Sequence, residues 1–258
     1  MTKVTISSSL SIKPLLYLNL HVGLIAWGFL LSAARWQNLD PGPALSLLVF
    51  CAAVAVYGLD RFGGFSPEDR INAPERCEWL DHHPRRQRGV IGLALLGVLL
   101  TVTMVSVHTR LVGGGYALFA ASYTRPLLPG RRRLQDISGL KLPCIVLGWA
   151  LLPALHPELA APEWWVYRAG WLIPNVLWSE WRDHPGDRHT PRPPPPRKIS
   201  LMLMAFTLCT GLCISAGRDL AGPLLYTLGL WRWSRRDPVS FSEKQDLFLL
   251  ASLVTALL

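Results

Sequence analysis

The chain has 258 residues, of which 50% are hydrophobic and only 17% are charged, yet its formal net charge is +9. A soluble domain usually has about a quarter of its residues charged, so this composition disfavours an ordinary cytosolic enzyme. The apolar content excludes low-complexity disorder, and five cysteines scattered over so long a chain exclude a secreted disulfide scaffold. Two classes remain, a nucleic-acid-binding protein and a membrane protein with a basic cytoplasmic face.

Apolar stretches follow one another along the whole chain, separated by charged or Pro/Gly-rich breaks. Because about 20 apolar residues are needed to cross a bilayer as a helix, we predict an all-α, polytopic membrane protein. It is expected to be a single domain over residues 1–258. Its nine predicted transmembrane helices are residues 14–34, 43–59, 89–108, 111–124, 140–156, 162–180, 199–217, 219–232 and 245–258. The short stretches 111–124 and 219–232 are also compatible with buried or re-entrant helices.

The first stretch has a second interpretation, a cleaved signal peptide. Lys13 precedes it, and Ser32-Ala33-Ala34 offers small residues for cleavage. The apolar run is longer than the usual signal-peptide core, which favours an uncleaved first helix.

Basic residues lie almost entirely on one side of this nine-helix arrangement. If the N-terminus is cytoplasmic, 22 of the 26 Lys and Arg residues fall in cytoplasmic segments and three fall outside. Such an asymmetry is the positive-inside signal. We therefore predict a multi-pass protein of the cytoplasmic membrane, with its N-terminus inside and its C-terminus on the opposite side. The number of spans excludes nucleic acid as a partner.

Arg168 is the remaining basic residue, and it lies inside the sixth predicted helix. A charge inside a membrane helix is costly and usually has a partner. We expect either such a partner or a side chain that reaches the outer boundary.

Two cytoplasmic connections carry acids directly after a predicted helix. Asp60 and Asp69 follow the second helix, and Asp183 and Asp187 follow the sixth. Since these helices are four apart in order, the pattern predicts two four-helix halves plus one helix, with a site between the halves. Carboxylates from two loops suit Mg²⁺, which takes few carboxylates together with waters and phosphate oxygens. The alternative is that these acids bind no metal and are solvated ion-pair partners of neighbouring arginines.

At these residues the chain resembles the UbiA-type membrane prenyltransferase superfamily. The second motif, Arg182-Asp183-His184-Pro185-Gly186-Asp187-Arg188, is similar to the family's Arg-Asp-x-x-x-Asp-Arg pattern. The family's first motif and its Tyr followed by basic residues are matched by Asp60-Arg61, Asp69, Asn72, Pro74, Arg76, Tyr123, Arg125 and residues 131–133.

The resemblance implies nine transmembrane helices and Mg²⁺-dependent transfer of a prenyl group from an isoprenyl diphosphate to an aromatic or lipid-like acceptor. It implies that the metal ligands and catalytic residues are Asp60, Asp69, Asp183 and Asp187. It implies that the diphosphate-binding residues are Arg61, Asn72, Arg76, Tyr123, Arg182 and Arg188. Glu180 and His184 are the candidates for a general base.

Two other functions stay open. A catalytically degenerate relative that binds isoprenoid or pigment lipids without turnover is favoured by Val56, which stands where the family has Asn or Asp. A small transporter ranks third, because its sign would be acids inside the helices, and the predicted helices are nearly free of them.

Overall fold

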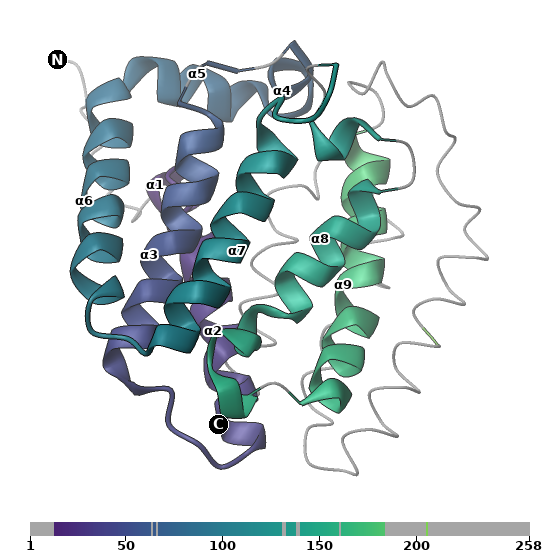
Figure 1. Ribbon diagram of the computed structural model, residues 1–258. Helices are drawn as coiled ribbons and strands as arrows, with labels where there is room; N and C mark the ends of the chain where they lie inside the picture. The colour runs from purple at the N-terminus through teal and green to yellow at the C-terminus, as the bar shows by residue number, and fades with distance from the viewer. Residues whose placement is uncertain are drawn as a thin grey trace, which may run out of the picture.

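The computed structural model describes residues 13–62, 64–65, 67–130, 133–137, 140–159, 161–183 and 205. This part of the chain is helical and contains no β-strand, so the all-α prediction is confirmed for it (Figure 1). Its elements are α1 (Lys13–Tyr17), α2 (Leu20–Trp36), α3 (Gly42–Asp60), α4 (Pro67–Asn72), α5 (Pro74–His82), α6 (Pro84–Val102), α7 (Val107–Thr124), η1 (Leu134–Asp136), α8 (Lys141–Ala150), η2 (Leu152–Leu155), η3 (Pro157–Leu159) and α9 (Pro162–Asp183). The predicted helices 199–217, 219–232 and 245–258 lie outside the described residues.

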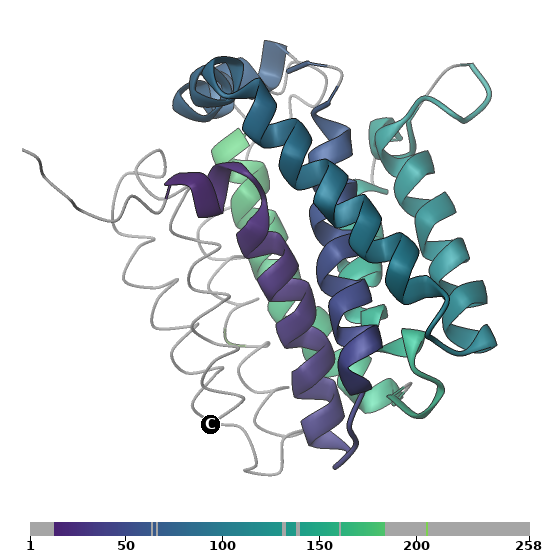
Figure 2. The ribbon, with the colours of Figure 1, turned by 90° about the vertical axis from the view of Figure 1, so that its left-hand side faces the viewer.

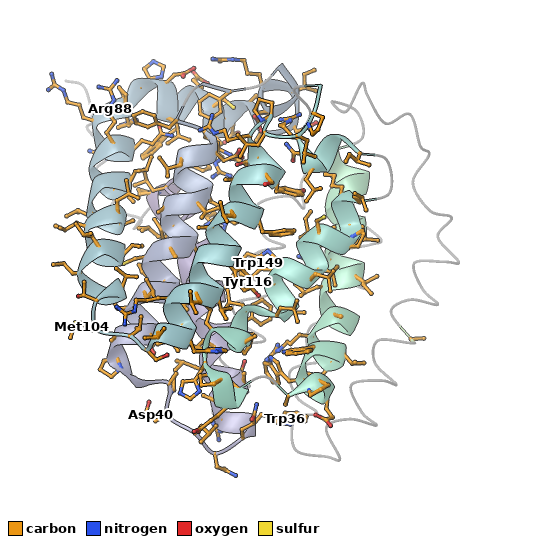
Figure 3. All side chains as sticks on the ribbon, viewed as in Figure 1. Trp36, Asp40, Arg88, Met104, Tyr116 and Trp149 are labelled. Atoms are coloured by element: carbon orange, nitrogen blue, oxygen red, sulfur yellow. The ribbon has the colours of Figure 1, made fainter. Side chains whose placement is uncertain are left out.

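The long helices of the described part run up and down one axis in alternating directions. In the orientation of Figure 1, α2, α6 and α8 run downward, and α3, α7 and α9 run upward (Figures 1 and 2). These six helices match the first six predicted helices in order. The alternation puts α4, α5 and the connection between α7 and α8 at one end of the bundle, and Trp36 and Asp40 at the other (Figure 3).

Two predicted boundaries are wrong where charged residues were assigned to a connection. The third helix, α6, covers Pro84–Val102 rather than 89–108, because Pro84 starts it and the neighbouring arginines belong to its first turns. The fourth, α7, begins at Val107 rather than 111. There the Ser106 hydroxyl oxygen accepts a hydrogen bond from the Thr109 N–H at 3.1 Å and caps the helix. A membrane-spanning helix needs apolar residues only in its middle, and its ends tolerate charged residues. A helix can therefore extend beyond the apolar stretch from which it is predicted.

Three further boundaries have local causes. The first predicted helix is divided into two helices, α1 and α2, because Asn19 between them adopts a left-handed conformation (φ 61°). The fifth is α-helical only to Ala150 and continues as η2, since Pro153 lacks the N–H that an α-helix requires. The sixth reaches Asp183, beyond its predicted end at residue 180.

The connection after α3 contains two helices that were not predicted, α4 and α5. Each begins with a Pro-Glu pair, Pro67-Glu68 and Pro74-Glu75. Proline at the first helical position and an acid in the first turn are helix-start signals, so the sequence contained the information. The two helices lie across the end of the bundle (Figure 2).

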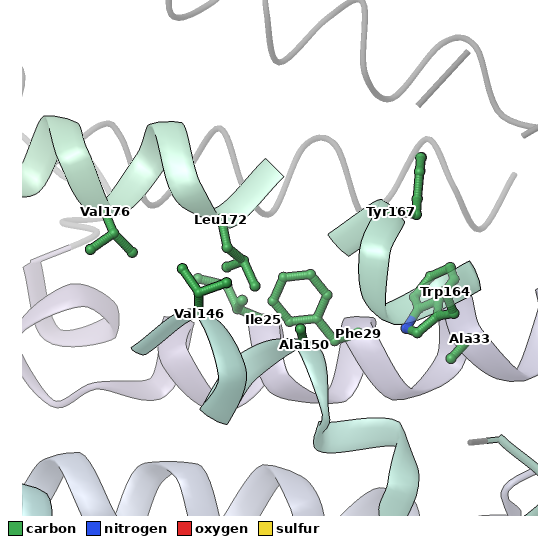
Figure 4. Packing of buried hydrophobic residues seen from close by; sticks show 9 residues of the cluster. All are labelled: Ile25, Phe29, Ala33, Val146, Ala150, Trp164, Tyr167, Leu172 and Val176. Atoms are coloured by element: carbon green, nitrogen blue, oxygen red, sulfur yellow. The ribbon is translucent and has the colours of Figure 1, made fainter. Parts of the chain in front are cut away.

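The core is built around α2, which packs against α3 on one side. On its other side, α2 shares a cluster of buried apolar side chains with α8 and α9. On the second side Phe29 lies among side chains of both helices (Figure 4). Small residues allow close approach: a Cβ on Gly23 would lie 2.7 Å from Val54, and one on Gly97 of α6 would lie 2.5 Å from the Cys51 sulfur. The helices are therefore fixed in rotation by their small residues as well as by their apolar faces.

Arg168 joins α9 to α2 from within this core. Its side chain is only 1% exposed, and its Nη2 donates a hydrogen bond to the Ser32 hydroxyl at 2.7 Å. The guanidinium carbon lies 4.3 Å from the ring centre of Trp164, 5.0 Å from that of Phe29 and 5.2 Å from that of Tyr167. The prediction of a buried partner is confirmed, and the alternative of a side chain reaching the boundary is wrong.

Only α3, among the helices described, is both long and apolar enough to cross a membrane, with a mean hydropathy of 2.0. The helices α2 and α8 are apolar but shorter. The first turns of α6 carry three arginines, and α7 contains Arg110 and three consecutive glycines, which lower their hydropathy.

Candidate functional site

The predicted first motif lies at the end of the bundle where α3, α7 and α9 finish and α8 begins (Figure 1). Here α4 packs against both α5 and α9. The contact between α4 and α9 brings the helix that carries Asp69 next to the helix that ends in Arg182 and Asp183. Segments far apart in the chain therefore meet at this end.

Asp60 lies within electrostatic range of four charged side chains. It is the last residue of α3 and is exposed. Asp69 of α4 is near enough to repel its carboxylate, while Arg61, Arg125 and Arg133 are near enough to attract it. We call these five residues the Asp60 cluster. Two of its members, Arg125 and Arg133, come from the connection after α7.

Arg125 is held in place by the end of α3. Its Nη2 donates a hydrogen bond at 2.8 Å to the main-chain carbonyl oxygen of Leu59. The last carbonyls of a helix have no partner inside it, and a cation favours the negative end of the helix dipole. Arg125 thus satisfies the end of α3 and stands beside Asp60. In the sequence, Arg125 is recognisable only as a basic residue after Tyr123. The alternating directions of the predicted helices place its loop at the same end of the bundle as the loop after α3.

Cys77 of α5 also lies within electrostatic range of two members of the Asp60 cluster, Asp69 and Arg61. Its side chain is buried, and burial raises the pKa of its thiol. The Asp69 carboxylate raises this pKa further, while Arg61 and two arginines of α4 and α5 oppose the shift. Asp69 and Arg61 are therefore within electrostatic range of Cys77 as well as of Asp60. A thiol of this kind is structural rather than reactive.

Arg76, predicted to bind diphosphate, donates hydrogen bonds to residues at the break between α1 and α2. Its Nη2 donates hydrogen bonds to the Asn19 side-chain oxygen and, at 3.5 Å, to the main-chain carbonyl oxygen of Tyr17. These atoms belong to the break between α1 and α2. Nearby, Lys13 pairs with Glu75 at 3.4 Å. Both contacts tie α5 to the start of the chain.

The other predicted residues are distributed around the cluster. Asn72 is half-buried at the end of α4, and Tyr123 is half-buried in the last turn of α7. Arg182 and Asp183 form the end of α9, although their side chains lie outside the described part. Asp187 and Arg188 also lie outside the described residues, as do the general-base candidate His184 and the side chain of Glu180.

The donor set suits a cation that takes few protein ligands. No group of three or more His, Cys, Asp or Glu side chains gathers within the ranges that the structure describes. Asp60 and Asp69 are two carboxylates within electrostatic range of each other. Mg²⁺ is commonly held by one or two carboxylates, with waters and substrate phosphate oxygens completing its shell. The two residues fit that pattern.

The chain matches no family model, and neither a curated protein nor a solved structure matches it.

Proposed function

We propose that the protein is a membrane-embedded enzyme that transfers a prenyl group, with Mg²⁺, from an isoprenyl diphosphate to a small aromatic or lipid-like acceptor. The observation that carries the proposal is the Asp60 cluster, in which carboxylates and guanidinium groups from three separate segments gather at one end of the bundle. The similarity of its motifs to the UbiA-type superfamily supports the same function.

The cluster has the charges that diphosphate departure requires. Arg61, Arg125 and Arg133 would donate charge-assisted hydrogen bonds to phosphate oxygens. Mg²⁺ bound to Asp60 and Asp69, with Asp183 and Asp187 completing the proposed ligand set, would neutralise charge on the leaving diphosphate. The arginines favour the same step because they bind negative charge that grows as the bond to the allylic carbon breaks. Arg76, already bonded to the start of the chain, would position α5.

The proposal includes a multi-pass topology in the cytoplasmic membrane, with the Asp60 cluster on the cytoplasmic side. Asn38, Arg110 and Glu158 belong to segments at the opposite end of the bundle (Figures 1 and 3). We expect reporter proteins fused after each of these three residues to report the outer side. A cytoplasmic readout from any one of them would overturn the proposed topology.

The function is tested with the purified full chain, Mg²⁺ and labelled isoprenyl diphosphates of several lengths. We expect release of diphosphate that EDTA abolishes and excess Mg²⁺ restores, because charge neutralisation is required for departure. Release should also be lost in Asp183→Ala and Asp187→Ala.

A different result separates the two remaining candidates. Saturable binding of the diphosphate without release would support a lipid-binding relative that lacks turnover. Val56 favours that candidate, since it lies one turn before Asp60 in α3 and offers no oxygen ligand. If neither binding nor release occurs, both candidates fail.

A further inference from the structure

The surface of α6 that faces away from the bundle carries two kinds of exposed residue. Its first turns expose Arg85, Arg86 and Arg88. Below them its apolar side chains are exposed, with Leu93 at 69% and Leu99 at 65%. Figure 3 shows this surface at the left edge of the molecule, with Arg88 at the upper end of the helix and Met104 just past its lower end.

The opposite side of α6 accounts for its packing. Ile91, Ala94 and Thr101 are buried there, and α6 packs closely against α3. With 3.6 residues per turn, Arg85, Arg88 and Leu99 fall on the side turned away from these three residues. Arg86 and Leu93 lie on the flank of the helix and are exposed there. The exposed side is therefore not needed to hold the helix in the bundle.

The three arginines have no partner within the protein that the structure describes. None of their guanidinium groups makes a hydrogen bond or an ion pair with a described residue, whereas Arg70, close by in the chain, pairs with Asp81 at 3.1 Å. They form a concentrated positive charge that is open to an external anion.

We propose that this surface binds an anionic phospholipid, with the headgroup phosphate on Arg85, Arg86 and Arg88 and the acyl chains along the exposed leucines. Arginine binds phosphate oxygens through paired hydrogen bonds, which gives specificity for a phosphate group. The inference rests on the membrane part of the proposed function and is independent of prenyl transfer.

The dimensions agree with one leaflet of a bilayer. Leu100 is twelve residues beyond Arg88, or about 18 Å along the helix at 1.5 Å per residue. One leaflet contributes about half of a ~30 Å hydrocarbon core, or ~15 Å. A lipid whose headgroup lies at Arg88 would thus cover the apolar surface down to about Leu100.

An aromatic group lies at the same end of the bundle as the arginines. Trp79 of α5 stacks on His83 with ring centres 4.2 Å apart, and its ring lies 5.6 Å from that of Tyr17. Trp and Tyr concentrate at the level of lipid headgroups. Their position supports a headgroup region at the start of α6.

Two glycines leave room between the arginines and the leucines. Gly89 and Gly92 are exposed, and a Cβ added to either would meet no atom within 4 Å. Their glycine character is therefore not imposed by packing within the protein. They open the helix surface at the depth where the glycerol of the lipid would lie.

The test uses the full chain in a neutral detergent, titrated with fluorescent phosphatidylglycerol or with phosphatidylcholine carrying the same tails. We expect tighter binding of phosphatidylglycerol than of phosphatidylcholine. We expect R85Q/R86Q/R88Q to weaken phosphatidylglycerol binding at least about tenfold, because each arginine near an anionic lipid surface adds to the attraction and the variant loses three of them. R35Q/R110Q, which removes arginines at the opposite end of the bundle, should bind like the parent. The exposed positions leave the fold intact, which thermal unfolding of each variant checks.

Three results would overturn the inference. The first is equal affinity for the two lipids, and the second is unchanged binding in the triple variant. The third is displacement of phosphatidylglycerol by inorganic pyrophosphate at similar concentration, which would assign the arginines to a soluble diphosphate instead. Membrane embedding is checked by a separate experiment, extraction with carbonate at high pH. Release of the chain from membranes without detergent would contradict the proposed membrane embedding, on which the lipid site depends.

Discussion

Asp60→Asn is expected to reduce diphosphate release at least about 100-fold, because removing one preorganised electrostatic group from a site of this kind typically costs that much in turnover. Asparagine has nearly the same shape, so the change removes charge and metal affinity without creating a cavity. The substitution also removes the carboxylate charge that attracts Arg61, Arg125 and Arg133. The expected result is therefore weaker Mg²⁺ dependence together with lower turnover, measured by release of labelled diphosphate across a range of Mg²⁺ concentrations.

Glu158→Gln is the matched control for this experiment. It removes one carboxylate charge from an exposed position at the opposite end of the bundle. Its release rate should equal that of the parent. Full activity in Asp60→Asn would remove Asp60 from the proposed ligand set, and equal loss in both variants would mean that global charge, rather than the cluster, controls the reaction.

Arg168→Ala is expected to lower the free energy of unfolding by about 3 kcal/mol, a typical cost of deleting a large buried side chain. The variant loses the hydrogen bond to Ser32, the contacts with three aromatic rings and the volume of the side chain. Because the hydrogen bond to Ser32 and the contact with Phe29 join α9 to α2, the loss should be cooperative for the whole bundle. Denaturant unfolding in a mild detergent measures it.

Two further variants divide this effect into its parts. Ser32→Ala removes the acceptor of the Arg168 hydrogen bond, together with the hydroxyl that donates to the Phe29 carbonyl oxygen, and should cost about 1–3 kcal/mol. Arg168→Lys keeps the charge but not the flat guanidinium that lies on the rings, so it should also be destabilising. Arg110→Ala, at an exposed arginine of α7, should change stability by less than about 0.5 kcal/mol. If Arg168→Ala unfolds with the parent, the side chain is not the connection that we describe.

The acidic motif after α3 illustrates how far the sequence can lead. Their spacing and a family resemblance predict a site that contains Asp60, Arg61 and Asp69, and the structure brings Asp60 and Asp69 within electrostatic range. The same resemblance predicts that Arg76 binds diphosphate, and the structure shows that its guanidinium donates hydrogen bonds at the α1–α2 break. Spacing along a chain does not say which way a side chain turns when a third segment packs beside it.

The sequence by itself determined the helical class, the order of the first six long helices and their alternating directions. These features depend on apolar runs, helix-start signals and the positions of charges, all of which are local in the chain. It also located Arg168 as a charge within a helix.

Only the tertiary structure decided which residues meet. Arg125 donates a hydrogen bond to the Leu59 carbonyl oxygen. The Arg168 guanidinium packs against three aromatic rings from two helices, and the arginines in the first turns of α6 are exposed. Each outcome depends on how one helix is rotated and placed against another. That rotation is set by the fit of many side chains at once, including contacts as close as Gly23 on Val54 and Gly97 on Cys51. A sequence pattern identifies the residues that take part in this packing, but it does not determine how they are arranged in space.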